Sequence, residues 1–197
     1  MKHLLYALLT AVSILFTSCG PSSNTNNPQV PNVPQPQPQP QPEVTQKVVI
    51  GYLALDDWEF ENLFPTIEWK YLTHINASFA RVKADGTLNI EPVRKRIESV
   101  RETAHKHNVK ILISLAKNSP GEFTTAINDP KARKELIQQI IAFTKEYKLD
   151  GFDIDYEEYD NWDKNFPSLL VFARGLYLAK EKNMLMTCAV NSRWLKI

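Results

Sequence analysis

Hydrophobic and polar positions form two alternating kinds of segment from Lys47 onward. Short runs rich in apolar and β-branched residues, typical of strands, occupy residues 48–55, 74–82, 109–116, 150–157 and 184–191. Between them, apolar residues at helical spacing predict helices over 91–107, 129–148 and 167–182. Asp129 followed by Pro130 is a typical helix start. Because strands and helices alternate, we expect a parallel sheet with helices packed outside it.

The pattern by itself leaves two architectures open, a doubly wound sheet and a barrel. No GxGxxG or GxxxxGK[ST] motif follows any predicted strand, so nucleotide binding loses its main support. The net charge is +1, and the lysines and arginines are scattered instead of clustered. This charge distribution argues against a nucleic-acid partner.

The first 46 residues have a different pattern. An apolar stretch from Leu4 to Phe16 follows Lys2, which is typical of a signal peptide and too short to span a membrane. The sequence FTSCG that follows resembles the lipobox of bacterial lipoproteins, which implies lipid attachment to Cys19. The alternative is an ordinary secretory signal in which Cys19 has no role.

A proline- and glutamine-rich repeat, PQPQPQPQP, then predicts an extended linker. We therefore expect a signal peptide over 1–18, a lipidated cysteine and linker over 19–46, and a folded domain over 47–197. The protein would be an exported bacterial lipoprotein in the cell envelope or at the cell surface, with the lipid as its only contact with the membrane.

Residues 149–158, LDGFDIDYEE, concentrate carboxylates in one predicted strand. In a strand, Asp153, Asp155 and Glu157 share one face, and the apolar residues between them share the other. An amphipathic strand with its acids in water is the ordinary explanation. A parallel strand covered by helices has no free outer face, so we expect these acids to point into a barrel interior or its mouth. Burying carboxylates together costs free energy, which indicates a functional site.

Two kinds of chemistry suit clustered carboxylates. A hard metal ion prefers carboxylate oxygens, but three alternate residues of one strand extend over roughly 13 Å, too far for all three to bind one ion. Acid catalysis fits better, because packed carboxylates cannot all ionise and a proton stays available near neutral pH. Cleavage of a glycosidic bond needs such a proton donor beside the leaving oxygen. We therefore expect no metal and no cofactor.

The motif at residues 150–157, DGFDIDYE, resembles the DGxDxDxE signature of family 18 glycoside hydrolases, the chitinase and endo-β-N-acetylglucosaminidase family. IGY at 50–52 and HINASFA at 74–80 are similar to that family's first two strands. The resemblance implies a (β/α)8 TIM barrel, of which this chain would supply about the first five β/α units. It also implies hydrolysis of β-1,4 N-acetylglucosamine linkages, in chitin oligosaccharides or in N-glycan cores.

The same resemblance implies roles for individual residues. Glu157 would be the acid and then the base of a substrate-assisted retaining mechanism, Asp155 would orient the acetamido group, and Asp153 would share a proton with Asp155. Asp150 and Gly151 would be structural. Four aromatic residues would either contact the sugar or pack in the core, namely Tyr52 and Phe79 on the first two strands and Trp58 and Trp162 in loops.

Two features depart from the family pattern. The third predicted strand ends in SLAK, residues 114–117, where many chitinases have Ser-x-Gly-Gly. Such barrels also need about 250 residues, so we expect a truncated hydrolase with weak or no activity. The alternatives are a surface lipoprotein that binds a glycan without cleaving it and a structural lipoprotein that binds none. Replacing Glu157 by glutamine would separate the enzyme, which would lose turnover, from the glycan-binding protein.

Overall fold

The computed structural model describes residues 47–158 and 161–189, apart from the side chain of Trp162. The predicted signal peptide, Cys19 and the linker all lie outside the described residues. Within the described residues, no helix is long and apolar enough to cross a membrane.

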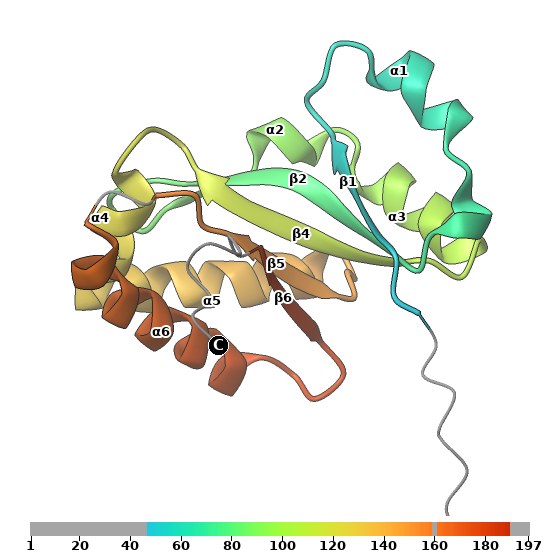
Figure 1. Ribbon diagram of the computed structural model, residues 1–197. Helices are drawn as coiled ribbons and strands as arrows, with labels where there is room; N and C mark the ends of the chain where they lie inside the picture. The colour runs from blue at the N-terminus through green and yellow to red at the C-terminus, as the bar shows by residue number, and fades with distance from the viewer. Residues whose placement is uncertain (1–46, 159–160, 190–197) are drawn as a thin grey trace, which may run out of the picture. The chain divides into compact units, whose positions relative to one another are not determined.

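In the part of the chain that the structure describes, six strands form one sheet (Figure 1). The five longer ones are parallel and lie in the order β1 (Ile50–Ala54), β2 (His74–Val82), β4 (Lys110–Lys117), β5 (Gly151–Asp155) and β6 (Leu185–Ala189). The two-residue β3 (Leu88–Asn89) pairs antiparallel with β2. Each long strand overlaps one of the predicted runs. The order follows the chain without the reversal of a doubly wound sheet, so the sheet is part of an α/β barrel.

Helices and short 3₁₀ turns connect the strands. They are α1 (Phe60–Leu63), η1 (Phe64–Thr66), η2 (Trp69–Tyr71), α2 (Glu91–Arg94), α3 (Ile97–Lys106), α4 (Glu122–Asn128), α5 (Pro130–Glu146) and α6 (Trp162–Ala179). The predicted start of α5 is confirmed, because the Asp129 side chain accepts a hydrogen bond from the Ala132 amide at 2.7 Å.

Two helix predictions need correction. The segment 91–107 forms α2 and α3 instead of one helix, with Arg96 between them. The Arg96 guanidinium donates hydrogen bonds to the carbonyls of Leu55 and Asp57, and this long-range contact holds the junction. The third helix begins at Trp162, ahead of Pro167, so the backbone of Trp162 is helical and does not lie in a loop. Proline is tolerated best in a first turn, which is why the sequence favoured a later start.

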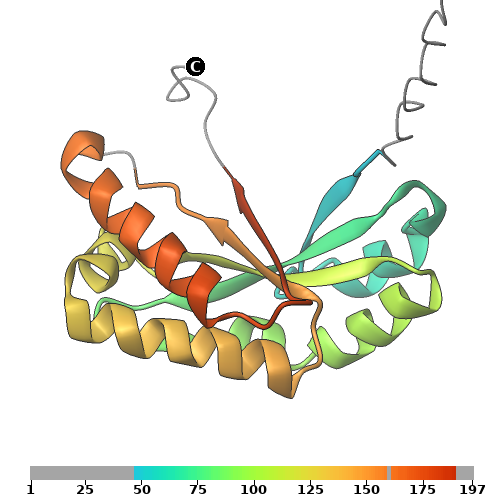
Figure 2. The ribbon, with the colours of Figure 1, turned by 90° about the horizontal axis from the view of Figure 1, so that it is seen from below.

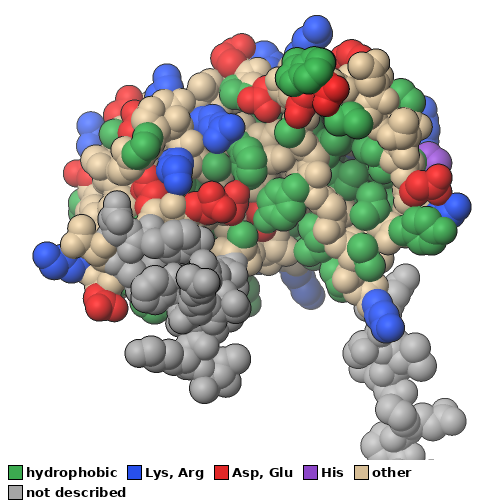
Figure 3. Space-filling model, turned by 45° about the horizontal axis from the view of Figure 1, so that its top comes forward, with side chains coloured by type: hydrophobic (Ala, Val, Ile, Leu, Met, Phe, Trp, Pro, Cys, Tyr) green, Lys and Arg blue, Asp and Glu red, His purple; other side chains and the backbone are tan. Residues whose placement is uncertain are grey.

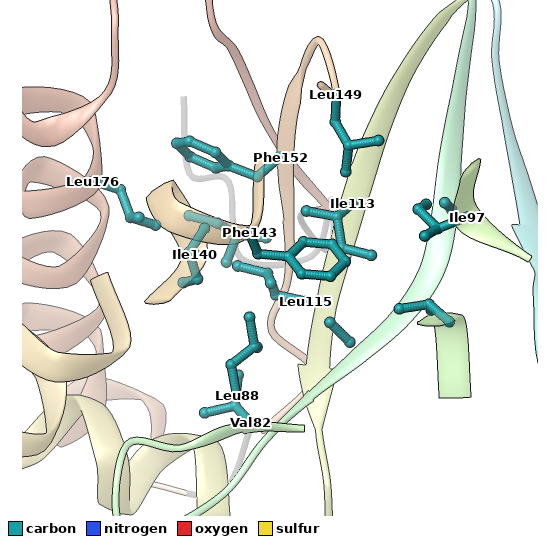
Figure 4. Packing of buried hydrophobic residues seen from close by; sticks show 14 of the residues in the cluster. Val82, Leu88, Ile97, Ile113, Leu115, Ile140, Phe143, Leu149, Phe152 and Leu176 are labelled. Atoms are coloured by element: carbon teal, nitrogen blue, oxygen red, sulfur yellow. The ribbon is translucent and has the colours of Figure 1, made fainter. Parts of the chain in front are cut away.

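The sheet is curved, with α3, α5 and α6 on its convex face (Figure 2). Apolar side chains of β4 and β5 fill the layer between the sheet and these helices. In Figure 4, Phe143 of α5 lies against Ile113 and Leu115 of β4. Burying one such side chain contributes about 1.5–3 kcal/mol. This core holds the strands in register and thereby fixes the positions of the residues on the opposite face.

The concave face carries polar side chains. Because side chains alternate along a strand, the residues that face away from the helices include Tyr52, Asn76, Ser114, Asp153 and Thr187, one from each long strand. The register sets Ser114 and Thr187 directly beside Asp153, one on each neighbouring strand. The outward face of these strands is therefore apolar, and the inward face holds the candidate site.

Candidate active site

Asp153 is the centre of the polar face. Its side chain is buried, and the residue is only 1% exposed. One carboxylate oxygen accepts hydrogen bonds from the Tyr52 hydroxyl and the Ser114 hydroxyl, each at 2.8 Å, and the other accepts from the Thr187 hydroxyl at 2.6 Å. These three hydroxyl groups come from β1, β4 and β6, and they offset the cost of burying the carboxylate.

Tyr52 and Asn76 lie next to each other across the β1–β2 pair. Burial of the Tyr52 phenol and its hydrogen bond to Asp153 raise the pKa of Tyr52, so the hydroxyl stays protonated and donates to the carboxylate. Asn76 is 2% exposed, and among the described residues its Oδ1 atom has no hydrogen-bond partner. A buried amide oxygen of this kind can accept a hydrogen bond from a bound molecule.

Asp155 is the last residue of β5 and is half-buried. Burial and the negative charges of Glu157 and Asp153 raise the pKa of Asp155 to about 6. The positive charges of Lys117 and Arg81 oppose this rise. A carboxyl group with this pKa exchanges its proton near neutral pH, which suits acid–base chemistry.

Glu157 lies two residues beyond the end of β5, in the loop that leads toward α6, and its side chain is exposed. The strand therefore ends earlier than the sequence predicted, and the three acids do not all belong to it. Lys117, at the end of β4, donates a hydrogen bond from Nζ to the backbone carbonyl of Glu157 at 2.9 Å. Glu157 occupies the edge at which the parallel strands end, where barrel enzymes place their catalytic groups.

A cavity of about 480 Å³ adjoins Glu157 between the loops that follow β4 and β5. Its lining residues are Lys117, Pro120, Gly121, Thr124, Thr125, Glu157, Glu158, Asn161 and Asn165. These side chains are mostly polar and can donate and accept hydrogen bonds. The described residues contain no group of three or more His, Cys, Asp or Glu side chains that could hold a metal ion.

The family model for glycosyl hydrolases family 18 matches residues 48–194. The chain belongs to this family. A crystal structure of a chitinase from Bacteroides thetaiotaomicron is 99% identical over 75% of this chain and 48% of its own, with a TM-score of 0.74. Chitinase B from Serratia marcescens is 27% identical over 57% of this chain and 28% of its own.

A family 18 chitinase from Cycas revoluta, solved in complex with (GlcNAc)3, is 23% identical over 72% of this chain and 45% of its own. Its TM-score is 0.62, and at that identity the likeness concerns the fold alone. The chain thus spans about half the length of the two solved structures and less than a third of the curated relative.

Asp150 and Gly151, the two motif residues that the resemblance predicts to be structural, lie at the opposite end of β5 from Glu157. Asp150 accepts hydrogen bonds from the Ile111 amide, Lys110 and His105 at 2.9, 2.9 and 2.7 Å. Although burial acts to raise it, these contacts hold the pKa of Asp150 below its usual value. A Cβ atom on Gly151 would lie 2.1 Å from the backbone oxygen of Leu185, so any larger residue would force β5 and β6 apart.

The four aromatic residues have separate positions. The rings of Tyr52 and Phe79 lie 6.3 Å apart, and the Arg81 guanidinium lies 5.0 Å from the centre of the Phe79 ring. Trp58, in the loop after β1, is 84% exposed. In Figure 3, hydrophobic side chains gather on the side of the molecule that carries β1 and α1. The side chain of Trp162 lies outside the described residues. Among the aromatic residues whose side chains are described, Tyr52 is the one that forms a hydrogen bond with one of the three acids.

Sequence reasoning missed three residues that contact the acids or their backbone, namely Ser114, Thr187 and Lys117, and it missed the separate contacts of Glu158. Ser114 and Thr187 are single hydroxyl residues within the apolar runs KILISLA and MLMTCAV, which is a signal that could have found them. Lys117 was seen only as a departure from the family pattern. Glu158 was counted among the acids, yet its carboxylate makes contacts of its own, described below.

Proposed function

We propose that this chain carries the acid strand of a hydrolase that cleaves β-1,4 N-acetylglucosamine linkages with retention of configuration. The observation that supports it most is the graded environment of three acids. Asp153 is buried and held by three hydroxyls, Asp155 is half-buried with a raised pKa of about 6, and Glu157 is exposed at the strand edge. Environments that separate the behaviour of neighbouring carboxyl groups are how acid and base roles are divided.

In the proposed reaction, Glu157 gives its proton to the glycosidic oxygen as the bond from that oxygen to the anomeric carbon breaks. The carbonyl oxygen of the substrate's own acetamido group attacks the anomeric carbon and forms an oxazolinium ring. The ionised Glu157 then removes a proton from water, which opens the ring at the anomeric carbon and restores the starting carboxyl group. The two inversions give net retention.

Asp155 acts on the acetamido group in this scheme. As a carboxylate it accepts a hydrogen bond from the acetamido N–H and stabilises the positive charge of the oxazolinium ring. Asp153 lies behind it as a fixed negative charge that is held by the hydroxyls of Tyr52, Ser114 and Thr187. The negative charge of Asp153 acts to raise the pKa of Asp155.

Chitin fragments are the substrate we favour over N-glycan cores. The Bacteroides structure that is 99% identical to the chain is described as a chitinase, and the Serratia relative carries the same description. The exposed Trp58 and half-exposed Tyr52 offer aromatic faces on which sugar rings can stack.

The test compares the chain with Glu157→Gln on chitooligosaccharides and on a high-mannose glycopeptide, with the anomer of the first product read by proton NMR. Glu146→Gln, an exposed acid at the end of α5, is the matched control. We expect retained configuration, cleavage of the chitooligosaccharide only, and loss of turnover with preserved binding in Glu157→Gln. Because the chain spans about half of its relatives, the longest product of the same reading frame is assayed beside it.

Inversion, or turnover that survives Glu157→Gln, would contradict the mechanism. If both the chain and the longer protein bind a glycan without cleaving it, the glycan-binding lipoprotein would be favoured instead. Absence of both binding and turnover would reject both proposals.

The proposed location rests on the sequence of the first 46 residues. Export with a lipid on Cys19 would hold the hydrolase at a membrane surface through the Pro/Gln-rich linker. Metabolic labelling with a radioactive fatty acid in a bacterial host tests it. We expect label in the wild type and none in Cys19→Ala, and equal labelling of both would contradict it.

A further inference from the structure

The backbone at Glu157 has no support from the sheet. The β4–β5 ladder ends at the pair Leu115 and Ile154, and the β5–β6 ladder ends at Asp155 and Ala189, so Glu157 lies two residues beyond the last paired position of β5. Within the part of the chain that the structure describes, the Glu157 carboxylate has no hydrogen-bond partner. Its position therefore depends on whatever holds its main chain.

Lys117 supplies one of these contacts. It is the last residue of β4, half-buried, and its Nζ donates to the Glu157 carbonyl at 2.9 Å. Many chitinases have glycine here, as part of the Ser-x-Gly-Gly motif, and glycine has no side chain that could reach across.

Glu158 supplies the other contact, and it uses both of its carboxylate oxygens. One oxygen accepts a hydrogen bond from the Gly121 amide, and the other accepts from the amide and the hydroxyl of Thr124 at 2.6 Å. The Thr124 hydroxyl also contacts the Tyr156 hydroxyl. The residues on both sides of Glu157 are therefore tied to the start of α4.

We propose that Lys117 and Glu158 are positioning residues, a clamp that fixes the main chain of Glu157 from the two neighbouring elements β4 and α4. The inference rests on the proposed function of Glu157 as the acid. An acid must lie within hydrogen-bond reach of the oxygen that it protonates, and a displacement of about 1 Å costs on the order of 10²-fold in rate. Both contacts are charge-assisted hydrogen bonds, which are about twice as strong as neutral ones.

Lys117 has a second effect that makes its role measurable. Its charge acts to lower the pKa of Asp155, so removing the charge lets that pKa rise above about 6. The charged and titratable groups that face Asp155 are Asp153 and Glu157 on its own segment, Lys117 on β4, Arg81 on β2, Tyr52 on β1 and Cys188 on β6. The Glu158 carboxylate instead binds Gly121 and Thr124 at the start of α4, so we expect its loss to leave the titration of Asp155 in place.

The experiment uses the full chain with Lys117→Met, Lys117→Arg and Glu158→Gln. Lys131→Met and Glu146→Gln, both exposed on α5, are the matched controls. We expect kcat to fall about 10- to 100-fold in Lys117→Met and Glu158→Gln, with KM within about twofold of the wild type. Lys117→Arg keeps most of the wild-type kcat. In the plot of kcat against pH, we expect only Lys117→Met to shift the limb that reflects the ionisation of Asp155 to higher pH.

A second measurement needs no turnover. In Glu158→Gln the side chain loses one of its two acceptor oxygens, so the amide protons of Gly121 and Thr124 exchange with solvent faster than in Glu146→Gln. In Lys117→Met the NMR shift of the Glu158 amide changes, because that amide shares its peptide unit with the Glu157 carbonyl.

Altered amide signals together with an inactive wild type would support the clamp and reject the proposed function. Exchange, shifts and kcat equal to those of the controls would overturn the clamp. A fall in melting temperature with an equal loss in kcat and in binding, and no movement of the pH limb, would also overturn it, because that is the result of a merely structural role.

Discussion

The two ends of β5 treat their acids in opposite ways. At the beginning of the strand, Asp150 accepts hydrogen bonds from Lys110, His105 and the Ile111 amide, and its pKa is held low. At the other end, Asp155 and Glu157 lie close enough to repel each other, and the pKa of Asp155 rises to about 6. The contacts at the first end stabilise the fold. The repulsion at the second end lowers the free energy of unfolding, but it provides carboxyl groups whose protons a reaction can use.

The largest expected effect concerns Glu157 alone. Glu157→Gln keeps the size of an exposed side chain and removes the proton donor, so kcat falls by about 10² to 10⁴. The melting temperature stays within about 1 °C of the wild type, because exposed substitutions change little. Turnover and thermal melting of the same preparation check both statements. A large loss of stability would mean that Glu157 stabilises the fold, as Asp150 does, and would contradict the prediction.

The next largest effect is expected at Gly151. Gly151→Ala places a methyl group against the Leu185 backbone, and separating β5 from β6 costs about 3 kcal/mol of unfolding free energy. Gly121→Ala is an informative control, because a Cβ there meets nothing within 4 Å, although its positive φ adds some strain. Chemical denaturation measures both variants. If Gly151→Ala destabilises the protein no more than Gly121→Ala does, the close approach of the Leu185 backbone is contradicted as the reason for glycine at position 151.

Asp150→Asn should cost about 2 kcal/mol at pH 7, since it removes a partly buried charge that is paired with Lys110 and accepts a hydrogen bond from the Ile111 amide. The pKa of Asp150 is lowered on folding, so its contribution is present above the unfolded value near 3.8 and is lost as the pH falls through the lower folded value. Denaturation at pH 7 and below pH 3 measures the difference. A gap between wild type and variant that is unchanged at low pH would exclude the charge as its cause.

The smallest effect has the opposite sign. The pKa of Asp155 rises on folding, so the ionised group destabilises the fold above about pH 6, and this penalty disappears as the pH falls toward 3.8. Asp155→Asn should therefore stabilise the protein at pH 7.5 by about 1 kcal/mol after allowance for solvent screening, and lose this advantage near pH 4. Activity should be lost at the same time. Thermal melting at both pH values is the measurement, and destabilisation at pH 7.5 would contradict the prediction.

Local sequence patterns predicted where the long strands lie in the chain, but they did not predict the order of the strands in the sheet. Apolar runs located all five long strands, and Asp129 with Pro130 located the start of α5. The order of the strands could not be read from periodicity, because it is set by contacts between distant segments. The break at Arg96 has the same origin, since its hydrogen bonds go to the carbonyls of the β1–α1 loop.

The candidate site divides in a similar way. The acid motif was visible in ten consecutive residues, but the hydroxyls around Asp153 come from three other strands and depend on their register. The alternation of polar and apolar residues also predicted that the strand extends to Glu157, whereas pairing with β4 stops at Ile154. Residues that act through the backbone, such as Lys117, leave no spacing pattern in the sequence.

The hydrogen bond between Tyr52 and Asp153 joins residues 101 positions apart and connects β1 with β5 across the two strands between them. Contacts of such long sequence separation form late in folding, because the entropy of closing the intervening loop must be overcome first. A folding intermediate without β1 in place would hold Asp153 with one of its donors missing. The acid site is therefore assembled only when the whole sheet is, and Tyr52→Phe should report on that final step through faster unfolding more than through slower folding.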